Sequence, residues 1–140
     1  IFEDTFAPAI KDFKGGCKIF LKKVKDPGRY GVPVFDKSNK KIIRIEEKPK
    51  KPKSNYAQTG FYLFDNQIFS FIKKLSPSKR GELEMTDAIN HYVKMGNIRF
   101  SLVKGRWHDA GTIDSLMESS FQISKKSLIF KRVYDSQNRF

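Results

Sequence analysis

The order of hydrophobic patterns along this chain predicts an α/β fold with a mixed sheet and flanking helices. Short strand-like runs fill the first half, and segments with apolar residues at helical spacing alternate with strands in the second half. The chain has 140 residues, 39% of them hydrophobic and 13 of them phenylalanine. That composition supports one ordered core and is short for two domains. Strands alternating with helices around one core predict the α/β class.

The expected elements of the first half follow from local residue patterns. A short helix is expected over residues 6–13, where Pro8 is tolerated in the first turn. An Asp-Pro-Gly turn follows the first strand, and Pro33 places the second strand at a sheet edge. Residues 48–55, which include two prolines, form an expected loop. The expected strands span residues 17–24, 31–36, 41–47 and 59–64.

Helices are expected to dominate the second half. Asp65 can cap a helix that Ser76-Pro77 ends, and a second helix over residues 83–95 ends at Gly96. Thr112 can cap a third helix, whose apolar residues recur on one side. The expected strands between these helices span residues 98–103 and 106–110.

The net charge of +13 is the most unusual bulk property of the chain. It suits a phosphate-rich partner, either a nucleic acid or a small phosphorylated substrate, and it also fits a region separated from an acidic remainder. The one cysteine, Cys17, cannot form an internal disulfide, and no run of residues is apolar enough to cross a bilayer. Nothing at the N-terminus resembles a signal peptide, so we expect a cytoplasmic protein.

The first candidate site is the sequence EEKP at the end of an expected strand. In α/β sheets, ligands bind beyond strand ends, where loops converge. The carboxylate of Glu47 suits sugar hydroxyls, and the ammonium of Lys48 suits a phosphate. The charges alone nevertheless favour an ordinary surface ion pair.

Two further stretches are candidates. In WHDAGT, Asp109 precedes an expected helix start, where a phosphate or Mg²⁺ could bind, although capping the helix explains it equally well. In RGELEMTD, Arg80 lies in a loop before a helix, a common place for a phosphate-binding guanidinium. The neighbouring carboxylates offer ion pairs as the ordinary explanation. We assign no role to His108 or His91.

Five stretches in order resemble the sugar-1-phosphate nucleotidyltransferases, and most of all the glucose-1-phosphate thymidylyltransferases. The stretches are RYGVPVF, EEKP, SNYAQTGFYLFD, RGELEMTD and WHDAGT. The resemblance covers residues 1–124 and implies the C-terminal, sugar-phosphate-binding part of a Rossmann-like nucleotidyltransferase domain. It overrides the surface ion pair as the explanation of Glu47 and Lys48.

The resemblance implies a role for each matching residue. The backbone of Gly31 would approach the sugar, Glu47 would accept hydrogen bonds from its hydroxyls, and Lys48 would bind the phosphate. Tyr62 and Arg80 would line or support the pocket. Gln58 would contact the substrate through its main chain, although the family commonly has a small apolar residue there. Asp109 would be the second of two aspartates that hold the catalytic Mg²⁺.

The implied reaction is nucleotidyl transfer, in which a phosphate oxygen of glucose 1-phosphate attacks the α-phosphorus of dTTP. The products are dTDP-glucose and pyrophosphate. Such chemistry depends on positioning and charge neutralisation, which lysine, arginine and a metal ion supply. A nucleotidyltransferase that uses UTP or another nucleotide fits the same residues.

Two parts of the chain depart from the family pattern. The glycine-rich nucleotide-binding loop and the first metal aspartate are missing, so we expect a fragment that is inactive alone. The resemblance implies that the full-length enzyme is a homo-oligomer. Residues 125–140 form a divergent basic tail. The main alternative function is a basic module that binds nucleic acid or another polyanion, although no nucleic-acid-binding signature is present.

Overall fold

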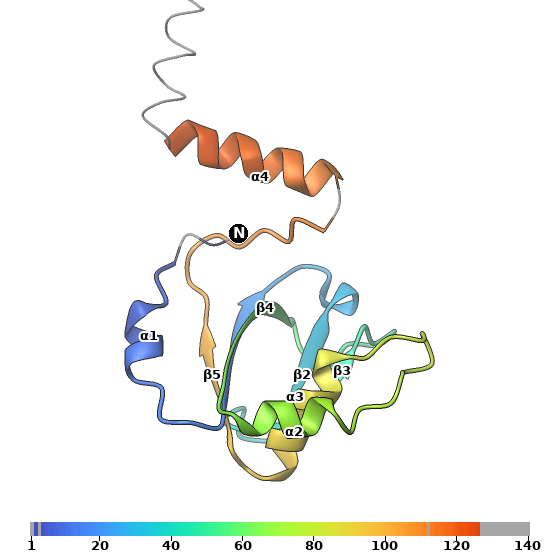
Figure 1. The fold of residues 1–140 in the computed structure, drawn as a ribbon. Helices are drawn as coiled ribbons and strands as arrows, with labels where there is room; N and C mark the ends of the chain where they lie inside the picture. Colours follow the sequence, from blue (N-terminus) through green and yellow to red (C-terminus); the bar gives the residue numbers. More distant parts are fainter. Residues whose placement is uncertain (1, 3, 112, 127–140) are drawn as a thin grey trace, which may run out of the picture. The chain divides into compact units, whose positions relative to one another are not determined.

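The computed structural model describes residues 2, 4–111 and 113–126 (Figure 1). They belong to two compact units. One unit spans Asp4–Lys104, and the other combines Ile1–Glu3 with Gly105–Phe140. The first unit contains all of the strands and three of the four helices that the structure describes.

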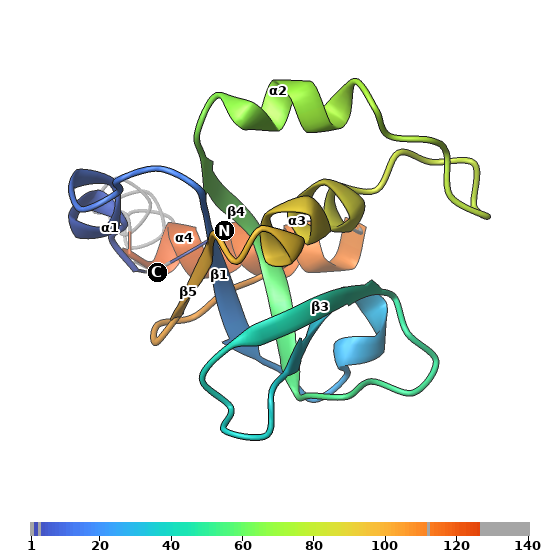
Figure 2. The ribbon, with the colours of Figure 1, turned by 90° about the horizontal axis from the view of Figure 1, so that it is seen from below.

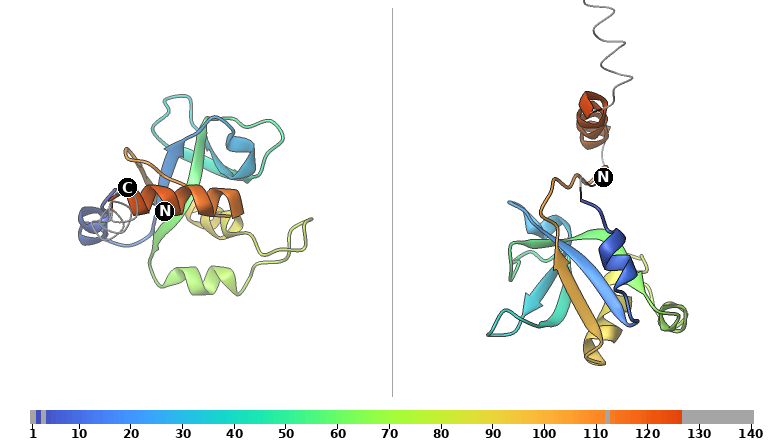
Figure 3. Two further views of the ribbon diagram at one scale, coloured as in Figure 1. Left: turned by 90° about the horizontal axis from the view of Figure 1, so that it is seen from above. Right: turned by 90° about the vertical axis from the view of Figure 1, so that its left-hand side faces the viewer.

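A three-stranded mixed sheet forms the centre of the first unit. Its strands are β1 (Cys17–Lys23), β4 (Tyr56–Phe64) and β5 (Ile98–Leu102), in the order β4-β1-β5. β4 runs antiparallel to β1, whereas β5 runs parallel to it, and β5 lies beside β1 in Figures 1 and 3. This combination confirms the predicted mixed sheet.

A hairpin forms a separate two-stranded sheet. Its strands are β2 (Gly31–Phe35) and β3 (Ile42–Glu47), which pair antiparallel. Because each strand has only one partner, Pro33 can lie in β2 without removing a hydrogen bond from a central ladder. The register places Gly31, the first residue of β2, opposite Glu47, the last residue of β3.

Three helices accompany these sheets in the first unit. They are α1 (Ala7–Lys11), α2 (Gln67–Ile72) and α3 (Met85–Lys94). Figure 2 shows α3 between α2 and β3, and α3 contacts both of them. Gly96 follows α3 with a φ of 66°, the left-handed conformation expected after a helix C-terminus.

The hydrophobic core of the first unit lies between its sheets and helices. Each large apolar side chain buried there contributes about 1.5–3 kcal/mol to stability. Strand β1 and helix α3 provide most of these side chains, because each turns one apolar face toward the other. The buried cluster consists of Cys17, Ile19, Leu21, Ile42, Ile45, Ile68, Ala88, Ile89 and Tyr92.

The side chain of Asn90 attaches β3 to α3. Its Oδ1 accepts a hydrogen bond from the Ile45 backbone N–H at 2.8 Å, and its Nδ2 donates to the Ile45 carbonyl at 2.9 Å. The carboxamide therefore replaces a neighbouring strand for this residue of β3. Ile45 is two residues from the end of β3, so this pair of bonds fixes Glu47 relative to α3.

Most predicted elements of the first unit are present with shifted ends. α1 is shorter than the expected helix, and β4 begins at Tyr56, three residues earlier than predicted. Asn66 occupies the N-cap position of α2, where Asp65 was expected. The Asp65 carboxylate still accepts the backbone N–H of Gln67 at 3.1 Å. The predicted turn at residues 26–28 contains a short 3₁₀ helix, Pro27–Arg29.

The second unit contains the helix α4 (Ile113–Lys126). The predicted strand over residues 106–110 is wrong, because only Trp107 pairs there, through an isolated antiparallel bridge to Phe2. The proposed cap, Thr112, lies outside the described residues. No helix in the described part of the chain is both long and apolar enough to span a membrane.

Candidate functional site

The candidate site lies where β3 ends against the start of β2. Gly31 and Glu47 are direct cross-strand partners, so the Glu47 carboxylate leaves the hairpin beside a residue without a side chain. The side chain of Glu47 is 25% exposed, so most of its surface is covered and a part still faces solvent.

The space over Gly31 is filled by side chains from two other elements. A Cβ atom at Gly31 would lie 2.2 Å from Gln58 Oε1 and 2.9 Å from Thr86 Cγ2. Gln58 comes from β4 and Thr86 from the first turn of α3, and both are buried. The close approach of these side chains is possible because Gly31 has no Cβ. The Gln58 side chain belongs to the site region, whereas the sequence had suggested only a main-chain contact there.

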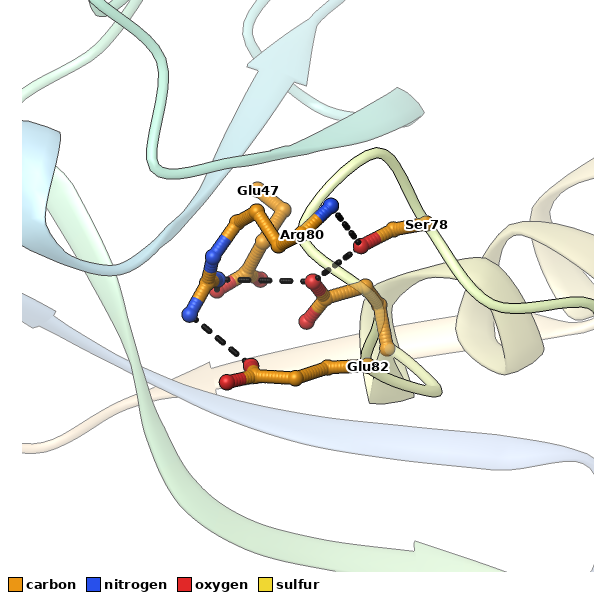
Figure 4. Close-up of polar contacts among 5 residues, drawn as sticks. Glu47, Ser78, Arg80 and Glu82 are labelled. Atoms are coloured by element: carbon orange, nitrogen blue, oxygen red, sulfur yellow. Dashed lines mark hydrogen bonds and ion pairs between the residues drawn. The ribbon is translucent and has the colours of Figure 1, made fainter.

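Glu47 belongs to a cluster of three carboxylates around the guanidinium of Arg80 (Figure 4). Arg80 Nη1 lies 3.8 Å from Glu47 Oε1 and 3.3 Å from Glu84 Oε1, while Nη2 lies 2.8 Å from Glu82 Oε2. Ser78 supports the cluster by donating to Glu84 at 2.9 Å. The pairs with Glu82 and Glu84 that the sequence suggested are present, and the same guanidinium also reaches Glu47.

The surroundings of Glu47 disfavour its negative charge. Burial raises the pKa of Glu47 most, and the nearby charge of Glu84 raises it further. The Thr86 hydroxyl, Lys48 and Arg80 oppose this rise in pKa. Hydroxyl donors or a cationic group of a ligand would stabilise the ionised form of a carboxylate in such surroundings.

Tyr62 faces the same region from β4. It pairs with the buried Ile19 of β1, so its side chain leaves the sheet on the core side. Burial raises the pKa of Tyr62 to about 12, and the charge of Glu47 adds to the shift. The phenol therefore stays protonated at neutral pH and is a hydrogen-bond donor close to Glu47.

Lys48 directly follows β3 and has an unusual backbone conformation. Its φ is 41°, and its backbone N–H donates to the Tyr30 carbonyl at 3.0 Å. A left-handed conformation costs a residue with a side chain about 1–2 kcal/mol. Such strain is found preferentially at functional sites. The Lys48 side chain is exposed beside Glu47, where it can meet an anion from solvent.

The structure thus brings together six residues singled out from the sequence: Gly31, Glu47, Lys48, Gln58, Tyr62 and Arg80. Thr86 and Glu84 belong to the same cluster and were missed as site residues. Both lie inside the RGELEMTD stretch, but only the fold brings them to Gly31 and Glu47. That these residues share one concave pocket remains a prediction.

Asp109 lies in the second unit. Its side chain is exposed and folds back over Gly111, where an added Cβ would lie 3.3 Å from Asp109 Oδ1. Carboxylate oxygens are the ligands that Mg²⁺ prefers, so Asp109 is chemically suited to hold that ion. Within the described residues, no group of three or more potential metal ligands is assembled.

The described residues form an α/β fold, with polar side chains gathered where the β2–β3 hairpin ends. The chain belongs to the nucleotidyl transferase family, whose model matches residues 1–126. A glucose-1-phosphate thymidylyltransferase of Neisseria gonorrhoeae is 44% identical to it over 108 residues, which cover 75% of this chain and 37% of that protein. The bifunctional protein GlmU of Methanococcus aeolicus is 40% identical over 125 residues, covering 89% of this chain and 30% of that protein.

Solved structures show the same relationship. A putative glucose-1-phosphate thymidylyltransferase of Bacillus anthracis, in complex with a sucrose, matches with a TM-score of 0.75 and 50% sequence identity. The match covers 84% of this chain and 48% of that one. A UDP-glucose pyrophosphorylase complexed with UDP-glucose has a TM-score of 0.74 at 24% identity, which shows the shared fold alone. The chain therefore spans about half or less of the proteins that it matches.

Proposed function

We propose that the end of β3 binds a sugar 1-phosphate, with glucose 1-phosphate as the preferred substrate. Glu47 accepts hydrogen bonds from sugar hydroxyls, and Lys48 pairs with the phosphate. Tyr62 and Arg80 support these groups, and the backbone of Gly31 approaches the sugar. The observation that carries the proposal is the environment of Glu47, a mostly covered carboxylate with a raised pKa that faces Gly31 and two further carboxylates. Hydroxyl donors stabilise such a group.

For the whole protein that contains this region, we propose transfer of dTMP from dTTP to glucose 1-phosphate. The identity to thymidylyltransferases supports this choice over UTP or another nucleotide. Lys48 holds the sugar phosphate so that its oxygen is positioned for attack, and its positive charge offsets the phosphate charge. Asp109 would help hold Mg²⁺, which when bound neutralises the charge on the phosphates. Parallel assays of the whole protein with dTTP and UTP test the nucleotide, and equal turnover with both would contradict the proposed preference.

Titration calorimetry with glucose 1-phosphate tests the binding proposal. We expect Glu47→Gln to weaken binding about tenfold or more, because hydrogen bonds to a charged acceptor contribute about 1.5–3 kcal/mol. Glu46→Gln is the matched control, since Glu46 is the preceding residue and pairs with Arg44 at 2.6 Å. Lys48→Met should also weaken binding, and Lys50→Met is its control. Equal affinities of the Glu47 and Glu46 variants would contradict the proposal.

A second candidate function, the binding of nucleic acid or another polyanion, rests on a different surface. A cavity of about 450 Å³ in the first unit is bordered by four basic residues, Lys18, Lys40, Lys41 and Arg99, over apolar side chains that include Phe100. This cavity suits a polyanion better than the acidic Glu47 cluster does. Replacing Lys40 and Lys41 by glutamine should lower the salt concentration that elutes the chain from a heparin column and leave glucose 1-phosphate binding unchanged. Loss of sugar-phosphate binding in that variant would place the sugar phosphate at the cavity.

A further inference from the structure

Gln58 carries a buried polar group without a hydrogen-bond partner. Only 6% of the residue is exposed, and its Nε2 is buried and unpaired in the described part of the chain. The carboxamide lies against Gly31, with its Oε1 2.2 Å from where a Cβ of that residue would be. If the oxygen and nitrogen of the amide were interchanged, the buried unpaired atom would be the oxygen instead of the nitrogen. Buried polar atoms are paired in the great majority of cases, so this one requires an explanation.

Neighbouring side chains show that the fold does not need an amide at this position. Thr59, the next residue of β4, is also buried, but its hydroxyl donates to the Phe20 carbonyl at 3.0 Å. Thr86, which also lies over Gly31, is 2% exposed, and its hydroxyl lies close enough to Glu47 to lower the pKa of that carboxyl group. The unpaired amide of Gln58 therefore lies over Gly31, the cross-strand partner of Glu47, whereas the hydroxyl of the next residue in β4 has its hydrogen bond. A methionine has nearly the same shape as glutamine and would remove the unpaired amide.

We propose that the Gln58 carboxamide determines sugar specificity by hydrogen bonding one ring hydroxyl of the bound sugar phosphate. The inference rests on the proposed sugar-phosphate site and assigns its selectivity to a side chain. The sugar hydroxyl accepts the N–H that is unpaired in the ligand-free protein, and Thr86 is close enough to take part. Binding requires a small rotation of the side chain away from Gly31, because the amide nitrogen is covered. A site built to bond a hydroxyl discriminates strongly against the analogue that lacks it, since its polar group is then buried unpaired.

Two measurements on the full chain test this inference. The first is NMR titration of the ¹⁵N-labelled chain with glucose 1-phosphate and with its 2-, 3-, 4- and 6-deoxy analogues. We expect one deoxy analogue to bind about tenfold more weakly than glucose 1-phosphate, and Gln58→Met to reduce that difference to about twofold. The side-chain NH₂ signal that is lost in Gln58→Met should shift when glucose 1-phosphate binds to the unmodified chain.

The second measurement is thermal unfolding without ligand. We expect Gln58→Met to raise Tm, because it removes an unpaired amide from the interior. Thr59→Val is the matched control, and it should lower Tm and leave the discrimination among sugar phosphates unchanged. Unchanged discrimination in Gln58→Met, or a lower Tm, would overturn the inference while leaving the proposed sugar-phosphate site intact. If none of the sugar phosphates binds the unmodified chain, the proposed function fails and this inference fails with it.

Discussion

Two carboxylates at strand ends of the same unit have opposite surroundings. Asp65 directly follows β4 and accepts hydrogen bonds from the Gly16 N–H at 2.8 Å and the Tyr92 hydroxyl at 2.7 Å. The backbone and side-chain nitrogens of Gln67 donate two more. Glu47 ends β3, and its ion pair is a long contact of 3.8 Å to a guanidinium shared with two other carboxylates.

The two pKa shifts express this difference. Burial acts to raise the pKa of Asp65, but the hydrogen bonds from Tyr92, Gly16 and Gln67 outweigh it and lower the pKa. At Glu47, burial and the charge of Glu84 raise the pKa. The fold itself supplies partners for the Asp65 charge, whereas it provides too few for Glu47. Asp65 is therefore a structural carboxylate, and the contrast supports the proposal that Glu47 binds an external ligand.

The largest difference is expected between the glycines beside the two carboxylates. In Gly16→Ala, the new Cβ would lie 2.8 Å from the Asn97 carbonyl oxygen, and the residue has a φ of 75°. We expect a loss of about 3 kcal/mol or more, from strain and from overlap with backbone that cannot move. Gly31→Ala should lose only about 1–2 kcal/mol, because the Gln58 side chain can rotate away. Urea unfolding measures the stability loss of both variants. A larger loss for Gly31→Ala than for Gly16→Ala would contradict the assignment of a structural role to the Asp65 strand end and a ligand-binding role to the Glu47 strand end.

The next largest effect is expected at the carboxylates themselves. Asp65→Asn should lower the free energy of unfolding by about 2 kcal/mol, because the buried Tyr92 hydroxyl loses a charged acceptor. Glu47→Gln should change it by less than about 0.5 kcal/mol. The control is Tyr92→Phe, made in the unmodified chain and in the Asp65→Asn variant. Tyr92→Phe should cost much less stability in the Asp65→Asn variant than in the unmodified chain. Equal costs would show that the Asp65–Tyr92 bond does not stabilise the fold.

The pH dependence of stability should have opposite signs at the two sites. The lowered pKa of Asp65 means that its stabilising contribution is complete above the ordinary value of about 4 and is lost as pH falls through the folded-state pKa. The raised pKa of Glu47 means that its contribution declines as pH rises from about 4 through the folded-state pKa. Asp65→Asn should therefore cost less stability at pH 2 than at pH 7. The stability of Glu47→Gln relative to the unmodified chain should increase as pH rises. The relative stabilities of the two variants should thus change in opposite directions with pH, and a change in the same direction would contradict the difference between the two sites.

The same contrast explains what could be predicted from the sequence. The β2–β3 hairpin, the helix α3 and the left-handed Gly96 were predictable, because turn residues, periodic apolar residues and helix-ending glycines act locally. The expected strand around Trp107 failed because its one bridge is to Phe2, more than a hundred residues away in sequence. Local patterns cannot specify such a partner.

The candidate site was only partly predictable for the same reason. The charges of Glu47 and Lys48 alone favoured a surface ion pair, and the family motifs were needed to choose a ligand site. No sequence pattern shows that Gln58 and Thr86 meet over Gly31, because the three residues come from three different elements, β4, α3 and β2. Likewise, the four donors to Asp65 are gathered by tertiary structure, so the sequence indicated only a helix cap there.

We propose that the strand end at Glu47, and not the one at Asp65, is a sugar-phosphate site. The most direct test follows backbone amide signals of the ¹⁵N-labelled chain during titration with glucose 1-phosphate, with glucose and inorganic phosphate as separate probes. We expect saturable shifts at Gly31, Glu47, Lys48 and Tyr62, larger with glucose 1-phosphate than with either probe alone, and none at Gly16 or Gln67. Shifts confined to the lysine-bordered cavity, or equal shifts with inorganic phosphate, would contradict the account.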